Sequence, residues 1–141
     1  VEYTTSTGKR TGRNLIPDRY FLVEREGDRL FRSRLLLELD VATHPNKRFA
    51  DQKVLPGIAY LRSEAYQKRF GSQSGRWLLV TTGDRRLSFL KETTERVAGR
   101  DATVWYFTTF DRVSVETVLT EPVWYKGGSQ EPVALFPPKN S

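Results

Sequence analysis

Two apolar runs constrain the fold more than any other feature of the sequence. RWLLVTT at residues 76–82 and TVWYFTT at residues 103–109 each hold a block of bulky apolar residues. Such continuous runs are typical of strands that are buried on both faces, as in parallel sheets. The segment between them, residues 83–99, has the periodicity of an amphipathic helix, with Leu87 and Leu90 on its apolar face. This order predicts a parallel strand–helix–strand unit.

The N-terminal part of the chain predicts antiparallel strands. A short edge strand is expected over residues 1–6, and two longer strands over 19–24 and 30–40. A Gly-Asp turn at positions 27–28 lies between the two longer runs, which favours a hairpin. We therefore expect an antiparallel meander that precedes the parallel strands.

Helices and a tail complete the expected order of elements. Apolar spacing predicts a helix over residues 47–62, kinked at the Pro-Gly pair 56–57, and a short helix over 110–119. A last strand is expected at EPVWY, residues 121–125. The prediction is a three-layer α/β domain over residues 1–125, with a mixed sheet flanked by helices. An extended C-terminal tail over 126–141 would follow it.

Three carboxylates are predicted to converge at one end of the meander. Strand alternation places Glu38 and Asp40 on one face, away from the odd-numbered leucines of the strand LLLELD. Pairing across the hairpin turn then makes Asp18 the cross-strand neighbour of Glu38. Carboxylates held together repel one another and favour a bound cation. Because Mg²⁺ and Mn²⁺ prefer oxygen ligands, we predict a site for either ion at Asp18, Glu38 and Asp40.

An ion-pair interpretation explains the same residues without a metal. In this alternative Asp40 caps a loop, and Glu38 pairs with one of three nearby cations, Arg19, Arg32 or Lys53. The spacing of the acidic residues fits both interpretations, and the sequence leaves the choice open.

The charge of the chain favours a nucleic-acid partner. The 141 residues carry a net charge of +6, with 23 basic side chains, most of them arginine. Arginine binds phosphate oxygens bidentately, so a basic, arginine-rich domain is expected to bind a polyanion. Candidate phosphate contacts lie in a basic loop, around a basic and aromatic stretch, and at a helix start. They are Lys9, Arg10, Arg13, Arg62, Lys68, Arg69, Arg85 and Arg86.

Composition excludes several other classes of protein. Cysteine is absent, which excludes disulfides and thiolate metal sites and suits the cytoplasm. A single histidine excludes the several imidazoles of a His-cluster relaxase site. No apolar run approaches the roughly 20 residues of a membrane span. The chain does not begin with methionine, so we expect a further N-terminal region upstream.

The order of the motifs resembles a known superfamily. IPD, then LLLELD on the next strand, then a helix and RWLLVTT, is similar to the PD-(D/E)xK restriction-endonuclease-like superfamily. Over residues 14–125 the chain also resembles the replication-relaxation family of plasmid and mobile-element proteins. The stretches that carry this resemblance are ELDVAT, AYLRSEAYQKRFG, LLVTTGDRRL, FTTFDRV and EPVWY.

The resemblance implies a function and roles for single residues. It implies a restriction-endonuclease-like fold and a DNA-binding domain that nicks or cleaves DNA with Mg²⁺ during replication or relaxation. Asp18 and Glu38 match the superfamily's acidic positions, and its catalytic lysine falls at Asp40 here. Lys53 on the neighbouring helix would supply the basic group instead. A non-catalytic DNA- or partner-binding module and a basic protein-interaction domain are the alternatives, and monomer or homodimer is left open.

Overall fold

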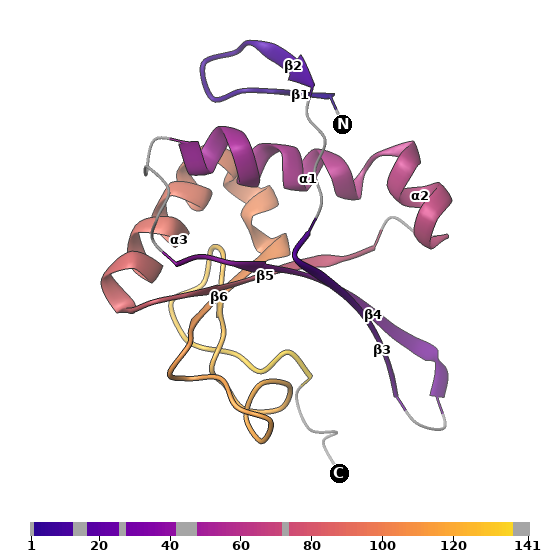
Figure 1. Cartoon of the computed structure of the whole chain (residues 1–141), viewed down its shortest axis with the longest axis vertical. Helices are drawn as coiled ribbons and strands as arrows, with labels where there is room; N and C mark the ends of the chain where they lie inside the picture. Colours follow the sequence, from indigo (N-terminus) through magenta and orange to yellow (C-terminus); the bar gives the residue numbers. More distant parts are fainter. Residues whose placement is uncertain (1, 13–16, 26–27, 42–47, 72–73, 137–141) are drawn as a thin grey trace.

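The structure, a computed structural model, describes residues 2–12, 17–25, 28–41, 48–71 and 74–136 (Figure 1). The strands are β1 (Glu2–Thr4), β2 (Arg10–Gly12), β3 (Arg19–Arg25), β4 (Asp28–Leu39), β5 (Arg76–Thr81), β6 (Trp105–Thr109) and β7 (Tyr125–Lys126). The helices are α1 (Leu55–Leu61), α2 (Glu64–Phe70) and α3 (Asp84–Ala98), with a π-helical turn η2 (Ala50–Val54) and a 3₁₀ helix η3 (Gly99–Val104).

The sheet has five strands in the order β3-β4-β5-β6-β7. The central strands β4, β5 and β6 are parallel, whereas β3 and β7 pair antiparallel at the two edges. The predicted mixed α/β sheet, with a hairpin followed by parallel strands, is therefore confirmed. The connection from β4 to β5 contains α1, the connection from β5 to β6 contains α3, and each places the next parallel strand on the same side of the previous one. Crossovers of one hand then place both helices on one face of the sheet (Figure 1).

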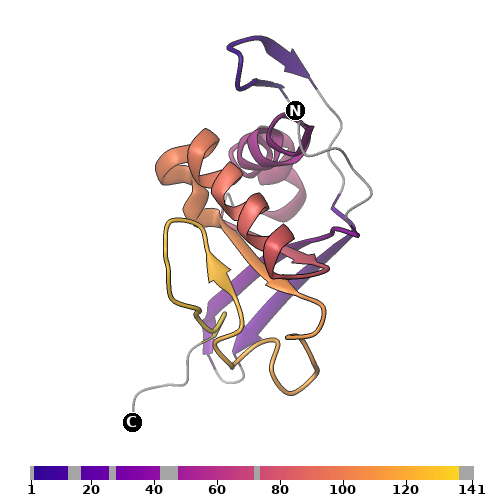
Figure 2. The same ribbon diagram turned by 90° about the vertical axis from the view of Figure 1, so that its left-hand side faces the viewer.

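The first predicted strand does not belong to this sheet. β1 instead pairs with β2 as a separate two-stranded ribbon that lies beyond α1 (Figure 2). Of its three residues only Tyr3 is buried, and the Tyr3 hydroxyl donates a hydrogen bond to the carbonyl of Asp51 at 2.6 Å. This bond ties the ribbon to the turn η2, in the helical layer.

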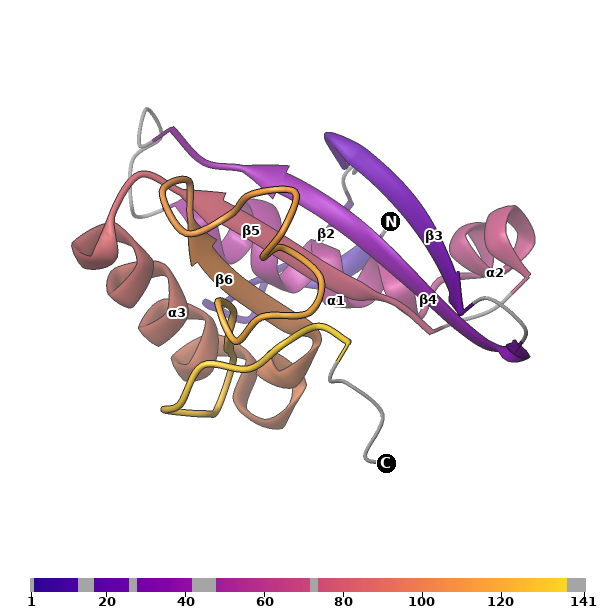
Figure 3. The same ribbon diagram turned by 90° about the horizontal axis from the view of Figure 1, so that it is seen from below.

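The two faces of the sheet are covered differently. The helical face packs Leu36, Trp77, Leu79, Trp105 and Phe107 against the helices. On the other face, Leu35, Leu78, Val80 and Tyr106 pack against Trp124 and Leu135 from the irregular segment 110–136 (Figure 3). The expected third layer therefore exists, but no helix forms it within the described residues.

The predicted helix at residues 110–119 is wrong. This segment forms turns, in which the hydroxyls of Ser114 and Thr117 hydrogen-bond to each other's backbone N–H groups. Val115 is 93% exposed, so its apolar side chain has no face to pack against. Ser and Thr offer the backbone such local partners and thereby compete with helix formation.

The segment expected to be a loose tail begins inside the sheet. β7 extends to Lys126, and Val133 forms a bridge with Trp124. Leu135 is only 4% exposed and belongs to the second core. Residues 126–136 are thus part of the packed domain, and 137–141 lie outside the described residues.

The kink predicted at the Pro-Gly pair is not a break there: α1 continues through Pro56 and Gly57, and the irregular winding lies just before them. The turn η2 is a π-helix, in which the N–H of Leu55 bonds to the carbonyl of Ala50 five residues before it. Pro56 follows in the first turn of α1. Because proline has no N–H and its ring crowds the carbonyl four residues earlier, the helix widens just before it.

Helices α2 and α3 also differ from expectation. Helix α2 was not predicted, although Ser63 caps it by accepting a hydrogen bond from the Tyr66 N–H at 3.1 Å. Helix α3 ends before Gly99, as expected, but Asp84 is its first residue and not its cap. No helix among the described residues is long and apolar enough to cross a membrane.

Gly57 allows α1 to lie directly on the tryptophans of the sheet. A Cβ at this position would lie 2.9 Å from Cζ2 of Trp105 and 3.1 Å from Nε1 of Trp77. These two indoles stack at 5.2 Å, and Trp77 donates to the Gly57 carbonyl at 3.0 Å.

We expect Gly57→Ala to destabilise the protein, although a helical Gly→Ala change usually stabilises by about 0.5–1 kcal/mol. Overpacking should reverse the sign and cost about 1–3 kcal/mol, measured by urea unfolding. Trp105→Phe removes the contacting ring atom, so the same substitution should cost less in that background. An equal cost in both backgrounds would contradict the contact.

Candidate functional site

The predicted carboxylates meet at the carboxyl ends of the parallel strands. Asp18, Glu38 and Asp40 all line one pocket of about 200 Å³, between the end of β4, the turn η2 and the start of α3. In open α/β sheets this edge is the usual position of a binding site. The convergence expected from the sequence is therefore present.

Strand register brings Asp18 to Glu38 as predicted. Arg19 lies opposite Leu37, and the N–H of Asp18 donates to the Leu37 carbonyl at 2.9 Å. The Oδ2 atom of Asp18 in turn accepts from the N–H of Leu39 at 2.9 Å. These two bonds fix the Asp18 side chain beside the end of β4.

Glu38 is a buried carboxylate that is only half satisfied. Its residue is 5% exposed, and Oε2 accepts a hydrogen bond from Nζ of Lys53 at 3.2 Å. Oε1 is buried and has no hydrogen-bond partner among the described residues. Burial raises the pKa of Glu38; Lys53 opposes this shift and the charge of Asp18 adds to it. The site thus contains a buried carboxylate oxygen, Oε1 of Glu38, that accepts no hydrogen bond from the described residues.

Asp40 has a different environment from that of the other two carboxylates. Its Oδ2 accepts from the Thr81 hydroxyl at 2.6 Å and from Nε of Arg86 at 3.0 Å. Its Oδ1 accepts from Nη2 of Arg86 at 3.3 Å. The guanidinium and hydroxyl occupy the carboxylate, so the three acids do not form one ligand set. In the described part of the chain, no group of three His, Cys, Asp or Glu residues is arranged to hold a metal.

Lys53 reaches the pocket from the helix that precedes α1. It belongs to the π-helical turn η2. From there its Nζ atom lies 3.2 Å from Oε2 of Glu38. This contact agrees with the role implied by the family resemblance and equally with the ion-pair interpretation. Among the cations proposed as partners of Glu38, the structure selects Lys53.

Sequence reasoning missed two polar residues of the pocket. Arg48 and Gln52 line it together with Lys53. Arg48 and Gln52 are four residues apart and share a helix face, but they lie five and one residues before Lys53, so a helical spacing counted from Lys53 would not have found them. Arg48 is exposed, which places a cation at the pocket mouth.

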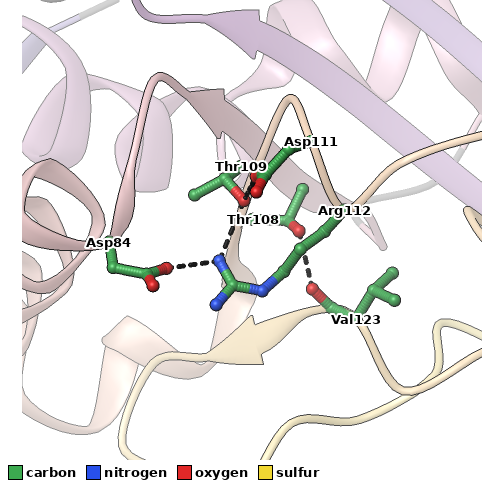
Figure 4. A network of polar contacts seen from close by, with 6 residues as sticks. All are labelled: Asp84, Thr108, Thr109, Asp111, Arg112 and Val123. Carbon is green, nitrogen blue, oxygen red and sulfur yellow. Dashed lines mark hydrogen bonds and ion pairs between the residues drawn. The ribbon is translucent and has the colours of Figure 1, made fainter.

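A polar network holds the turn after β6 against the start of α3 (Figure 4). Arg112 donates to Asp84 at 2.5 Å and to the Thr109 hydroxyl at 2.8 Å, while Thr109 also bonds to Asp111. The hydrogen bond from Arg112 lowers the pKa of Asp84 and raises that of Arg112. This network anchors the first turn of α3, the turn that carries Arg86.

The basic residues predicted to contact DNA lie on several elements. Lys9 precedes β2, and Arg10, within β2, pairs with Glu2 at 2.9 Å. Lys68 and Arg69 are exposed on α2, and Arg85 is exposed on α3. Arg62 follows α1 and pairs with Asp101 at 2.7 Å. Arg86 alone of the described seven lines the acidic pocket, and Arg13 lies outside the described residues.

Comparison of the chain with protein-family models, with curated proteins and with solved structures finds no match. The site must therefore be interpreted from its own chemistry. That chemistry is two carboxylates at a sheet edge, one of them buried with a free oxygen, and a lysine within hydrogen-bond distance.

Proposed function

We propose that this chain is a DNA-binding, nuclease-like domain of a plasmid or mobile-element replication or relaxation protein, with a restriction-endonuclease-like fold. It hydrolyses a phosphodiester bond with Mg²⁺ or Mn²⁺ held by Asp18 and Glu38. The observation that carries this proposal is the unpartnered Oε1 of the buried Glu38 beside a second carboxylate. The net charge of +6 supports a polyanionic substrate.

The two carboxylates fit a hard divalent ion. Mg²⁺ keeps several waters and is commonly bound by one or two carboxylates together with substrate phosphates. A bound cation would give Glu38 Oε1 the partner that it lacks and would offset the repulsion from Asp18. A third protein carboxylate is not required, so the engagement of Asp40 with Arg86 is compatible with this site.

Each residue of the pocket then has a distinct task. The metal ion, when bound, would neutralise phosphate charge and lower the pKa of a water molecule. Lys53 holds Glu38 through one N–H and has further N–H donors for a water or a phosphate oxygen. Arg48 at the pocket mouth attracts the DNA backbone. Arg86 on α3 donates to Asp40 and so connects the end of β4 to α3.

A nicking assay tests the proposal. Supercoiled plasmid is incubated with the protein in Mg²⁺, in Mn²⁺ or in EDTA, and open-circle product is measured. We expect nicking in either metal, none in EDTA, and loss of about 100-fold or more in Asp18→Asn. Glu64→Gln, an exposed carboxylate on α2, is the control and should nick normally. Nicking by the Asp18→Asn protein at the wild-type rate would show that the assigned site is wrong.

A second candidate is a non-catalytic DNA-binding module of the same fold. The ion pairs Glu38–Lys53 and Asp40–Arg86 favour it, because they satisfy much of the acidic charge without a metal. This module would bind DNA with an affinity that falls steeply with salt and does not respond to Mg²⁺. Salt-dependent binding without nicking, in wild type as in Asp18→Asn, would identify it.

A further inference from the structure

A second pocket lies at the other end of α1, where β5 begins. Its volume is about 390 Å³. Three arginines line it from three elements: Arg34 from β4, Arg62 from the end of α1 and Arg76 from the start of β5. The hydroxyl side chains Ser33 and Ser74 also line it, and none of its lining residues is acidic.

Arg34 is the least satisfied cation of this pocket. Its Nε is buried and has no hydrogen-bond partner among the described residues. Its single hydrogen bond is a long one, from Nη1 to the hydroxyl of Ser74 at 3.4 Å. The Arg34 side chain as a whole is half-buried, and removing a charged group from water is costly where no anion compensates it. No carboxylate lines the pocket that this side chain borders.

Arg76 adds a second cation that has no carboxylate partner among the described residues. It donates to the Ser33 hydroxyl at 2.8 Å and to the Leu135 carbonyl at 3.3 Å, both of which are neutral. Its guanidinium also lies over the ring of Tyr106 at 5.2 Å. These contacts hold Arg76 in place while leaving its charge uncompensated.

Arg62 pairs with Asp101 at the surface, at 2.7 Å, so this pair contributes little net charge. Within the part of the chain that the structure describes, the pocket therefore keeps two positive charges without a paired carboxylate, those of Arg34 and Arg76. A phosphate monoester carries about −1.5 to −2 charges at neutral pH and offers three acceptor oxygens. Arginine forks match such oxygens bidentately, so charge and donor geometry both suit this group.

We propose that this pocket binds a phosphate monoester, the terminal phosphate of a nucleotide or of a DNA 5′ end. Arg34 and Arg76 are its ligands, through the N–H groups of their guanidinium ends. The site is separate from the acidic pocket and does not depend on the proposed nuclease function.

Calorimetric titration of the full chain in EDTA, at constant ionic strength, tests the proposal. The probes are a nucleoside 5′-monophosphate and one oligonucleotide prepared with a 5′-phosphate or a 5′-hydroxyl end. We expect binding of a phosphomonoester probe and an affinity about tenfold lower or worse in Arg34→Met. Arg96→Gln, an exposed arginine on α3, is the matched control and should bind as wild type.

The probes separate the two sources of phosphate. A DNA end is the ligand if the 5′-phosphorylated oligonucleotide binds about tenfold more tightly than the 5′-hydroxyl one, and Arg34→Met removes the difference. A free nucleotide is the ligand if the monophosphate binds and the two oligonucleotides do not differ. Equal affinity of Arg34→Met and wild type for every probe, or no binding of any, would overturn the proposal.

Two further variants keep the test decisive. Arg34→Met removes an unpaired buried charge, so its melting temperature should equal or exceed that of wild type. If it does not fold, Arg76→Gln is the substitute and should also weaken binding. Glu92→Gln, which changes an exposed carboxylate on α3 outside both pockets, should bind the probes as wild type does. Because the titration is run in EDTA, where the proposed nuclease is inactive, a failure of this site stays separate from a failure of the nuclease proposal.

Discussion

Replacing Glu38 with glutamine is expected to reduce metal-dependent nicking about 100-fold or more while making the folded protein more stable. The amide keeps the size of the side chain but removes the negative charge that would bind the cation. The same change removes the cost of burying a carboxylate whose Oε1 has no partner. Substitutions that relieve such a site commonly stabilise by about 0.5–2 kcal/mol, often at the expense of activity.

The stability gain should depend on pH in a defined direction. Burial raises the pKa of Glu38 above its ordinary value of 4.5. Because its pKa is raised on folding, Glu38 is protonated more readily in the folded than in the unfolded chain. Its contribution to the free energy of unfolding is therefore fully present below the unfolded pKa. It is lost as pH rises through the folded pKa. Glu38→Gln lacks this loss, and its advantage over wild type should therefore grow from pH 4.5 toward neutral pH.

Urea unfolding of both proteins at several pH values, together with the plasmid assay, measures the two effects. Glu64→Gln again serves as the control, because Glu64 is exposed and lies on α2, outside the pocket. Its stability and nicking should match wild type. A Glu38→Gln protein that is less stable at neutral pH would show that the Lys53 ion pair outweighs the desolvation of Glu38.

Replacing Arg86 with methionine should cost about 3–5 kcal/mol of folding stability, because it leaves Asp40 without its cation. The side chains of Arg86 and Asp40 are only 14% and 9% exposed, so water screens the pair poorly. Methionine retains most of the apolar stem of Arg86, although it also removes the guanidinium that lies over the Phe89 ring at 5.9 Å. The loss therefore reports mainly on the uncompensated carboxylate.

A double-mutant cycle with Asp40→Leu separates the pair from its surroundings. The double variant removes both charges, so it should be more stable than Arg86→Met alone. Chemical denaturation of the four proteins gives the coupling energy. A loss below about 1 kcal/mol in Arg86→Met, the range of exposed pairs, would mean that the pair behaves as a surface salt bridge.

Much of the site could be predicted because it depends on local rules. The period of two in LLLELD places Glu38 and Asp40 on one face, and the hairpin register places Asp18 opposite Glu38. The apolar runs of β5 and β6 predicted buried parallel strands for the same reason. These features need only a few neighbouring residues and no knowledge of the tertiary fold.

The remaining features depend on contacts between distant segments. Asp40 meets Arg86 across 46 residues, a pairing that alternation within one strand cannot reveal. Lys53 points to Glu38 because η2 winds as a π-helix, which shifts side chains from their expected helical positions. The segment 110–119 is shaped by the sheet face it covers and by Ser and Thr side chains, which override its helical spacing.

The metal site can be observed in crystals of the protein soaked in Mn²⁺, because the ion is identified by its anomalous scattering. We expect one anomalous peak between Glu38 and Asp18, bonded to Oε1 of Glu38, and its absence from crystals of Glu38→Gln. Asp40 should remain paired with Arg86 in both. A wild-type crystal without a peak at this position, in which Glu38 stays paired with Lys53 alone, would contradict the metal site.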